Sequence, residues 1–173
     1  MTEREGELLR LLAELLEYPD EELLQKAKIC HEIVAELRPT AAGGMKEFVA
    51  FLDGESAGKV EELYTATFDL KPQCYPYAGY QLFGDEDPKR SQLMVKLRES
   101  YQADGFDAGD ELPDYVPLLL RFTAHMRDEE LKQDLEEQVL APVLHKMAQV
   151  LGLQHNPYGK VVAAAHSVMS DQE

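Results

Sequence analysis

The chain has 173 residues, of which 45% are hydrophobic and 29% are charged, a balance typical of a globular protein rather than a disordered one. Its 17 basic and 33 acidic side chains give a formal net charge of −16, which argues against binding to the phosphate backbone of nucleic acids. A chain of this length can bury a core without metals or disulfides, so we expect residues 1–173 to form a single domain.

The cysteines and the N-terminal residues indicate the cellular compartment in which the protein is expected to function. Cys30 and Cys74 are far apart and form no CxxC pattern, which suits a reducing environment. The first residues, Met1 to Glu7, lack the basic-then-apolar order of a signal peptide. No apolar run approaches the ~20 residues that a membrane helix requires. These features predict a cytoplasmic protein without a transmembrane segment.

Leucines at helical spacing open the pattern of predicted elements: Leu8, Leu11, Leu12, Leu15 and Leu16. This stripe predicts a first helix that closes at Tyr18-Pro19. Asp20 is placed to cap a second helix, which ends near Arg38-Pro39. A third and shorter helix is predicted after Gly43-Gly44. The N-terminal quarter of the chain is therefore expected to be entirely helical.

The middle of the chain is less regular. A glycine- and serine-rich loop over residues 53–58 leads into a fourth helix, and the segment 71–79 has no clear period. Asp87-Pro88 is typical of an N-cap followed by proline at the first helical position. Gly105 is placed to end the helix that begins there.

The C-terminal third returns to helical periods. Pro113 and Pro117 fit only a first turn or a kink, so a helix is predicted to begin there. Asp128 caps a longer helix that Pro142 should bend and Gly152 should end, and Asn156-Pro157 opens the last helix. No sustained strand pattern or repeat occurs. The chain is therefore predicted to be all-α, a single compact bundle of about eight or nine helices.

No pattern indicates catalysis, a metal or a cofactor. The five histidines have no i, i+3 or i, i+4 relation to one another: His31, His125, His145, His155 and His166. The segment Gly54 to Val60 suggests a phosphate loop, but it has three residues between its glycines and Val60 in place of the Ser or Thr that would hold magnesium. A helix connector is the favoured interpretation. We expect no metal, no cofactor and no enzyme activity.

Two acidic clusters stand before predicted helices: Asp85, Glu86 and Asp87, and then Asp110, Glu111 and Asp114. Capping of helix N-termini explains them most simply. Recognition of a basic peptide and acid/base catalysis are the alternatives, and catalysis would need an apolar pocket that shifts a pKa. The tyrosines of residues 75–80 are too dense for one helical face, so some of them are expected to line a groove.

Four segments in this order resemble the nitrate reductase delta-subunit chaperones, part of the wider molybdoenzyme chaperone family that also serves dimethyl sulfoxide and trimethylamine N-oxide reductases. The third and fourth segments are the most specific. The segments are Leu63-Tyr64-Thr65-Ala66-Thr67-Phe68-Asp69-Leu70, Gly79-Tyr80-Gln81-Leu82-Phe83-Gly84-Asp85 with Lys89-Arg90 and Leu93 after it, Tyr101-Gln102-Ala103-Asp104-Gly105-Phe106, and Glu111-Leu112-Pro113-Asp114-Tyr115-Val116-Pro117.

This resemblance implies an all-helical, non-enzymatic assembly factor, a monomer or a dimer. Such a protein binds the N-terminal region of a molybdopterin-containing catalytic subunit, often a twin-arginine signal peptide, and holds the apoenzyme until its cofactor is inserted, before export or membrane attachment. Two other functions stay open: a permanent structural subunit of a respiratory complex, and a small helical enzyme that uses the acidic clusters.

The resemblance also implies a peptide-binding site, for which eight residues are candidates: Tyr64, Phe68, Tyr80, Asp85, Arg90, Glu111, Asp114 and Tyr115. The carboxylates of Asp85, Glu111 and Asp114 are expected to accept hydrogen bonds from guanidinium groups of the peptide. The tyrosines and the neighbourhood of Val116–Leu120 are expected to take its apolar part, although some of that run must belong to the core.

Overall fold

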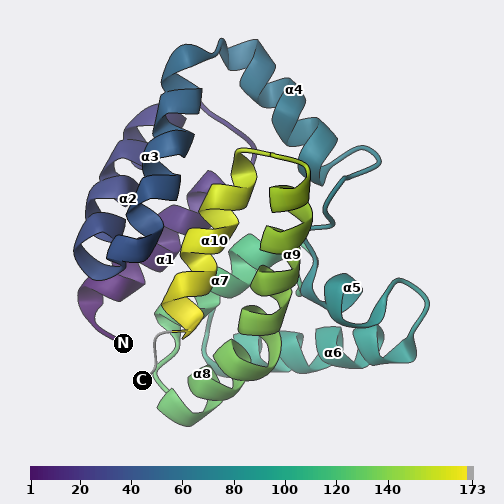
Figure 1. The fold of residues 1–173 in the computed structure, drawn as a ribbon. Coiled ribbons are helices and arrows are strands. Elements are labelled where there is room, and N and C mark those ends of the chain that lie inside the picture. Colours follow the sequence, from purple (N-terminus) through teal and green to yellow (C-terminus); the bar gives the residue numbers. More distant parts are fainter. Residues whose placement is uncertain (171–173) are drawn as a thin grey trace.

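Helices make up nearly all of the regular structure (Figure 1). The computed structural model describes residues 1–170, and in this range it contains no β-strand. Because α8, η1 and α9 follow one another without a break, the described residues form nine separate helical rods, which confirms the predicted all-α fold. The elements are α1 (Glu3–Leu15), α2 (Leu23–Leu37), α3 (Pro39–Gly54), α4 (Ala57–Phe68), α5 (Ala78–Phe83), α6 (Pro88–Ala103), α7 (Val116–His125), α8 (Glu129–Leu135), the π-helical turn η1 (Glu136–Leu140), α9 (Ala141–Leu153) and α10 (Tyr158–Ser170).

Helix α1 packs against three other helices, α2, α7 and α10 (Figure 1). Leucines form its apolar face, as predicted, but the buried face is wider than the predicted stripe. Leu9 is fully buried although it lies outside that stripe, whereas Leu11, inside it, is only partly buried. A helix covered from several directions buries a broader arc of its surface than a helix that packs on one neighbour.

Several helix ends agree with the local signals in the sequence. The Asp87 side chain accepts a hydrogen bond from Lys89 N ahead of α6, and Asp128 accepts hydrogen bonds from two backbone N–H groups of α8. The Asn156 side chain accepts a hydrogen bond from Tyr158 N at the start of α10. Gly105 follows the end of α6 with φ of 62°, a conformation that glycine adopts without strain.

Other helix boundaries differ from the predictions. Helix α3 begins at Pro39, because proline is well suited to the first turn, and it runs through Gly43-Gly44. Asp20 accepts a hydrogen bond from Glu22 N but lies in the turn before α2 rather than at its N-cap. Helix α9 runs past Gly152 to Leu153. A short helix, α5, occupies residues where no helix was predicted.

Pro142 was expected to bend its helix, and the structure places the π-helical turn η1 immediately before it. Proline lacks the N–H that would bond to the carbonyl four residues earlier, and its ring crowds that carbonyl. A π-helical turn widens the backbone at this point and so accommodates the ring. The helical rod therefore continues past Pro142 instead of ending there.

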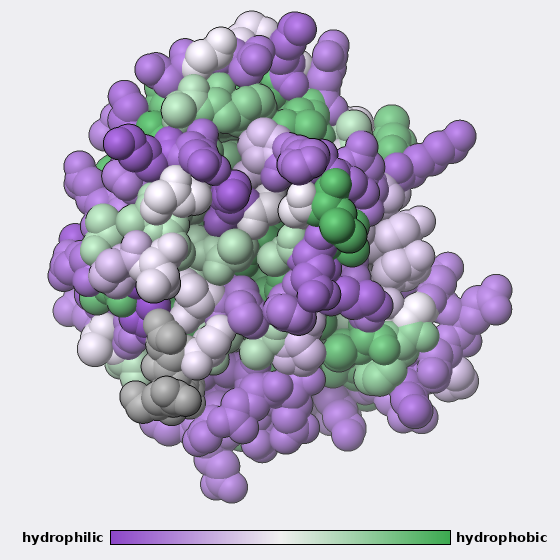
Figure 2. Space-filling model, in the orientation of Figure 1, coloured by the Kyte–Doolittle hydropathy of each residue, from purple (hydrophilic) through white to green (hydrophobic). Residues whose placement is uncertain are grey.

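The surface agrees with the high net charge. Hydrophilic side chains cover most of the face seen in Figure 2, and apolar side chains come to the surface in smaller areas, one of them beside α5. Within residues 1–170, no helix has both the length and the apolar character needed to cross a membrane. Helix α4 has no extended packing interface with another helix of the described chain, so parts of its surface stay open.

Candidate functional site

Three surface hollows have similar volumes, about 370, 420 and 440 Å³, so the side chains that line them distinguish them better than size does. The third hollow, which we call the tyrosine pocket, is formed by four segments that are distant in the sequence. They are the turn after α1, the end of α4, the segment before α5 and the segment before α7. Its lining residues are Glu17, Tyr18, Tyr64, Phe68, Asp69, Pro76, Tyr77, Glu111 and Tyr115.

The rings of the tyrosine pocket are held from behind by core contacts. Tyr64 is buried, and its hydroxyl donates a hydrogen bond to Leu16 O at 3.0 Å. The ring of Tyr64 packs against Phe68 at a centroid distance of 5.3 Å and meets Tyr18 edge-on at 5.5 Å. The Tyr64 hydroxyl also lies 3.5 Å from that of Tyr115. These contacts fix the aromatic wall before any ligand arrives.

The phenols of this wall stay protonated. Burial raises the pKa of Tyr115 to about 12 and raises the pKa of Tyr64 further. The pKa of Tyr77 is raised as well, first by burial and then by the negative charges of Glu111 and Asp114. The pocket therefore offers neutral rings and O–H groups, and its charge comes from carboxylates alone.

Three carboxylates border the tyrosine pocket. Glu17 is already engaged, because Arg121 binds both of its oxygens, with Nη2 at 2.7 Å from Oε2. Asp69 and Glu111 are exposed and form no ion pair within the described part of the chain. No lysine or arginine of residues 1–170 lines the pocket. A ligand with a positive group and an apolar part would meet complementary chemistry here.

Behind the pocket wall, Asp114 is fully buried and bound by this chain's own groups. Its Oδ2 accepts hydrogen bonds from Gly79 N at 3.0 Å and from Arg90 Nε at 3.2 Å. A second nitrogen of Arg90, Nη1, lies 3.1 Å from Oδ1 of the exposed Asp85. The other oxygen of Asp114, Oδ1, is buried without a hydrogen-bond partner among the described residues. We call Gly79, Asp85, Arg90 and Asp114 the arginine lock.

The arginine lock holds two tyrosines of the pocket in place. Tyr77 and Tyr115 form an isolated antiparallel bridge, in which Ala78 N donates to Asp114 O at 2.8 Å and Val116 N donates to Pro76 O at 2.9 Å. The Arg90 guanidinium lies over the Tyr77 ring, 5.7 Å from its centroid. The lock and the bridge thus join the segment before α5 to the segment before α7.

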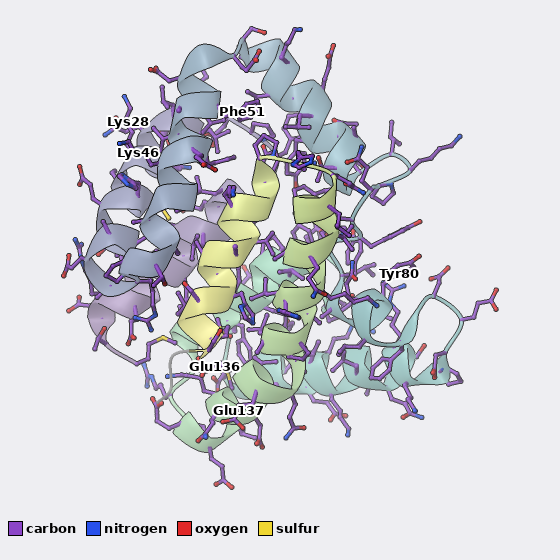
Figure 3. The ribbon with its side chains drawn as sticks, viewed as in Figure 1. Lys28, Lys46, Phe51, Tyr80, Glu136 and Glu137 are labelled. Carbon is purple, nitrogen blue, oxygen red and sulfur yellow. The ribbon has the colours of Figure 1, made fainter. Side chains whose placement is uncertain are left out.

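The eight predicted site residues fall into three groups. Tyr64, Phe68, Glu111 and Tyr115 line the tyrosine pocket. Asp85, Arg90 and Asp114 belong to the arginine lock, so the three acids predicted to bind guanidinium groups do not share one hollow. Tyr80 lies within α5 and does not line the pocket, and its ring is stacked on that of Tyr75 with a centroid distance of 3.8 Å (Figure 3).

The apolar run Val116–Leu120 is fully or almost fully buried in α7, because α7 packs along α1. It is therefore core and offers no surface to a peptide, which corrects the expectation that its neighbourhood would take the apolar part. Sequence reasoning missed Glu17, Tyr18 and Asp69 as pocket residues. Glu17 and Tyr18 precede α4 by about 40 positions in the chain, and no local pattern connects them with Tyr64.

Other candidate chemistry has little support. Within residues 1–170, no group of three or more His, Cys, Asp or Glu side chains could hold a metal ion. His145 of α9 and His166 of α10 do lie together, with ring centroids 5.3 Å apart, a pairing that within-helix spacing could not reveal. Both cysteines are buried, and burial raises the pKa of each thiol to about 12, so they are poor nucleophiles.

The segment from Gly54 to Val60 is a helix connector, as favoured above. It contains the last residue of α3 and the first turn of α4. The Ser56 side chain accepts a hydrogen bond from Lys59 N and so caps the N-terminus of α4. The serine and the glycines therefore have a structural explanation that requires no phosphate.

The family model described as "Nitrate reductase delta subunit" matches residues 35–163, well over half of the chain. The chain belongs to this family. The match covers α4, the arginine lock and most of the tyrosine pocket, while Glu17 and Tyr18 lie before it.

Among curated proteins, a relative in this family is the nitrate reductase molybdenum cofactor assembly chaperone NarJ of Escherichia coli (strain K12). It is 27% identical over 154 residues, which cover 87% of this chain and 64% of the relative. A relative in Bacillus subtilis (strain 168), described as "Probable nitrate reductase molybdenum cofactor assembly chaperone NarJ", is 29% identical over 114 residues, which cover 64% of this chain and 60% of the relative. The chain thus spans a little under two thirds of the relatives it matches.

A solved structure shares the fold. A crystal structure described as that of a redox enzyme maturation protein from Archaeoglobus fulgidus superposes with a TM-score of 0.63, over 94% of this chain and 91% of that one. The two sequences are 20% identical, so the likeness concerns the fold. The family's helical arrangement thus extends to an archaeal protein.

Proposed function

We propose that this protein is a cytoplasmic assembly chaperone that binds the N-terminal segment of the catalytic subunit of a molybdopterin-containing reductase. It would hold that subunit while its cofactor is inserted, before export or membrane attachment. The observation that carries the proposal is the tyrosine pocket, in which preformed rings stand beside two unpaired carboxylates. The names of the curated relatives, both assembly chaperones for nitrate reductase, give independent support.

The proposed recognition divides a basic and apolar segment between two kinds of contact. Asp69 and Glu111 accept hydrogen bonds from an arginine of the client, whose guanidinium can bind a carboxylate through two nitrogens. Exposed ion pairs of this kind contribute only ~0–1 kcal/mol each. Burial of apolar side chains against Tyr18, Tyr77 and Tyr115, whose rings are partly or largely exposed, must therefore supply most of the affinity, at about 25 cal/mol per Å². Tyr64 and Phe68 are buried and support this surface from behind.

The remaining candidate residues take supporting positions in this proposal. Arg90, with Asp85 and Asp114, holds Tyr77 and Tyr115 in the wall rather than contacting the client directly. Tyr80 and Tyr75 form a second aromatic surface outside the pocket. No group in the pocket is arranged as a nucleophile with a base, so we propose that the protein binds its client and catalyses no reaction.

Calorimetric titration with a synthetic peptide of the N-terminal segment of the nitrate reductase catalytic subunit from the same organism tests this proposal. Glu111→Gln and Tyr115→Ala should each weaken binding, since they remove a carboxylate and a ring of the pocket. Glu32→Gln, at an exposed position in α2, is the matched control for lost charge and should bind like the native protein. No binding by the native protein, or equal weakening by the control, would refute the proposal.

The alternative of a permanent structural subunit is tested by the state of the co-purified reductase. A chaperone should be recovered with catalytic subunit that lacks its cofactor and should be absent from the active enzyme. Recovery in fixed stoichiometry with active, cofactor-loaded reductase would favour the structural subunit instead. The molybdenum content of the co-purified material separates the two outcomes.

A further inference from the structure

Two histidines on neighbouring helices form a pair that lies outside the tyrosine pocket. His145 is in α9 and His166 is in α10, and their ring centroids are 5.3 Å apart at an interplanar angle of 45°. His145 is exposed and His166 is half-buried, so solutes can reach the pair from the surface. Rings inclined in this way are neither stacked nor edge-on, the two arrangements that aromatic packing favours. Packing alone therefore gives a poor explanation of the pair.

The helices hold both histidines in fixed positions. Helices α9 and α10 pack along each other over an extended interface and are joined by a short turn at residues 154–157. Leu144, next to His145, and Ala165, next to His166, are fully buried in the core. The two imidazoles are thus presented by rigid elements, as a preorganised ligand site requires.

The separation of the rings fits one shared metal ion. Such an ion is bound by one nitrogen of each imidazole at ~2.0–2.1 Å, which places the ring centroids about 5 Å apart when the angle at the metal is tetrahedral. The separation between His145 and His166, 5.3 Å, agrees with this requirement. Both side chains can therefore enter one coordination sphere without a movement of α9 or α10.

The ring nitrogens are available for binding. His145 forms no hydrogen bond or ion pair with the described part of the chain. Beside His166, Ser170 Oγ lies 3.3 Å from Nδ1 and 3.5 Å from Nε2, and it donates its proton to the His166 carbonyl at 2.6 Å. The hydroxyl oxygen can then accept a hydrogen bond from Nδ1, which leaves Nε2 unprotonated, as a metal ligand must be.

The charges of the molecule favour a cation at this place. The net charge of −16 raises the concentration of cations near the surface. Lys146 follows His145 in the chain, but its ammonium group donates a hydrogen bond to the Gln81 carbonyl of α5 at 2.7 Å. Its positive charge is therefore held toward a helix other than α10.

We propose that His145 and His166 form a binding site for one divalent transition-metal ion, such as Zn²⁺ or Ni²⁺, which joins α9 to α10. Neutral imidazole suits these ions, whereas Mg²⁺ and Ca²⁺ prefer oxygen ligands. Within residues 1–170, no third His, Cys, Asp or Glu side chain completes the set, so water fills the remaining positions and binding is reversible. This inference goes beyond the proposed function and does not depend on it.

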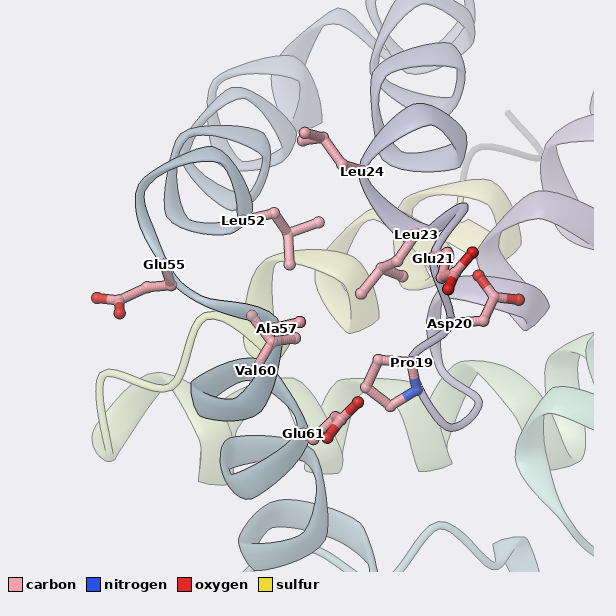
Figure 4. A pocket seen from close by; sticks show the side chains of 10 residues that line it. All are labelled: Pro19, Asp20, Glu21, Leu23, Leu24, Leu52, Glu55, Ala57, Val60 and Glu61. Carbon is pink, nitrogen blue, oxygen red and sulfur yellow. The ribbon is translucent and has the colours of Figure 1, made fainter.

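Exposed carboxylates are the competing sites for a divalent cation on so acidic a chain. Four of them border the hollow between the turn before α2, the end of α3 and the start of α4: Asp20, Glu21, Glu55 and Glu61 (Figure 4). Glu55 lies on the opposite side of this hollow from Asp20 and Glu21, so these groups do not converge on one point. Binding at such scattered oxygens would not respond to the loss of a histidine.

Calorimetric titration with ZnSO₄ tests the site, with the whole chain freed of metal by a chelator and held about one pH unit above the usual histidine pKa of ~6.5. The native protein should bind one equivalent at the histidine pair. His145→Gln and His166→Gln should each lower the affinity for this equivalent by about tenfold or more, because each leaves a single imidazole. His31→Gln, at a half-buried position in α2, is the matched control and should bind like the native protein.

NMR spectra with Ni²⁺ locate the bound ion, because this ion is paramagnetic in octahedral coordination and broadens the signals of nearby nuclei. The amide signals around residues 145 and 166 should broaden first in the native protein. In His145→Gln and His166→Gln this selective broadening should be lost. Circular dichroism and thermal unfolding check that each variant is folded.

The outcomes decide whether the pair is a metal site. If the native protein binds no Zn²⁺, or if both variants bind it as tightly as the native protein, the two rings only pack against each other and the inference is wrong. Equal weakening by His31→Gln, or broadening centred on the acidic hollow of Figure 4, would assign the binding to other groups and overturn it as well. Failure of this inference leaves the proposed function untouched, since no peptide enters the experiment.

Discussion

At the scale of single residues, the arginine lock explains why the sequence around residues 111–117 can be recognised and yet misread. Asp114 and Tyr115 are neighbours in an extended segment, so their side chains point to opposite sides. Tyr115 faces the pocket, while Asp114 points inward to Gly79 and Arg90. The motif lies at the tyrosine pocket, but which of its side chains face the pocket depends on an alternation that the sequence did not reveal.

Gly79 is required by crowding. A Cβ atom at this position would lie 2.6 Å from Arg90 Cγ and 2.8 Å from Asp114 Oδ2. Gly79→Ala should therefore lower the free energy of unfolding by about 1–3 kcal/mol, measured by urea denaturation. Gly58→Ala, also within a helix but with open space around it, is the matched control and should be neutral or stabilising by up to ~1 kcal/mol. If the two variants were equally stable, the close packing of Gly79 against Arg90 and Asp114 would contribute nothing to the free energy of unfolding.

The buried ion pair of the lock should show strong coupling. Arg90→Ala leaves the fully buried carboxylate of Asp114 without its cation, and removal of one partner of such a pair costs about 3–5 kcal/mol. The double variant Arg90→Ala/Asp114→Ala should lose less free energy of unfolding than the two single variants lose together, and the difference, the coupling energy, should be about 0.5–3 kcal/mol. Asp85→Ala, which removes only the exposed partner, should cost no more than ~1 kcal/mol. If the losses in free energy of unfolding were additive in this double-mutant cycle, Arg90 and Asp114 would not interact energetically.

At the scale of helices, the sequence predicted those helix ends that are determined by contacts between neighbouring residues. The caps at Asp87, Asp128 and Asn156 are side-chain contacts within a few residues, and the sequence was sufficient to find them. Helix α5 depends on distant groups. Gly79 N donates to Asp114, and the Gln81 carbonyl accepts a hydrogen bond from Lys146 Nζ at 2.7 Å. No periodicity in residues 71–83 could therefore have predicted it.

The pair of helices α9 and α10 should respond to mild acid through His166. Burial lowers the pKa of His166 below its usual 6.5, and the neighbouring His145 lowers it further. The unfolded chain thus binds a proton more readily than the folded one, so this contribution to stability is present above pH 6.5 and is lost as the pH falls through 6.5 toward the folded pKa. Urea denaturation over this pH range should show that His166→Gln loses less free energy of unfolding on acidification than the native protein does.

The matched control for this pH dependence is His31→Gln, which replaces a half-buried histidine of α2 that has no ring contact with another histidine of the described chain. This variant leaves the contact between His145 and His166 in place, so the loss of stability that this contact predicts should remain. If His166→Gln and the native protein lost stability in parallel, the contact between His145 and His166 would have no energetic consequence.

At the scale of the whole molecule, the tyrosine pocket forms because the fold brings segments together that are distant in the sequence. Its acids and rings come from the turn after α1, the end of α4 and two segments that meet at the bridge between Tyr77 and Tyr115. The resemblance to a family supplied Tyr64, Phe68, Glu111 and Tyr115, because these residues lie within its motifs. Glu17, Tyr18 and Asp69 became visible only when helix packing brought these segments together.

NMR mapping of the client peptide on the native protein, residue by residue, tests most directly whether the tyrosine pocket is the binding site. On titration with the N-terminal segment of the reductase catalytic subunit, the backbone amide shifts should change most at Tyr64, Tyr77, Glu111 and Tyr115. Changes confined to the hollow between α3 and α10, which contains Phe51 and Lys160 and is of similar volume, would contradict this assignment.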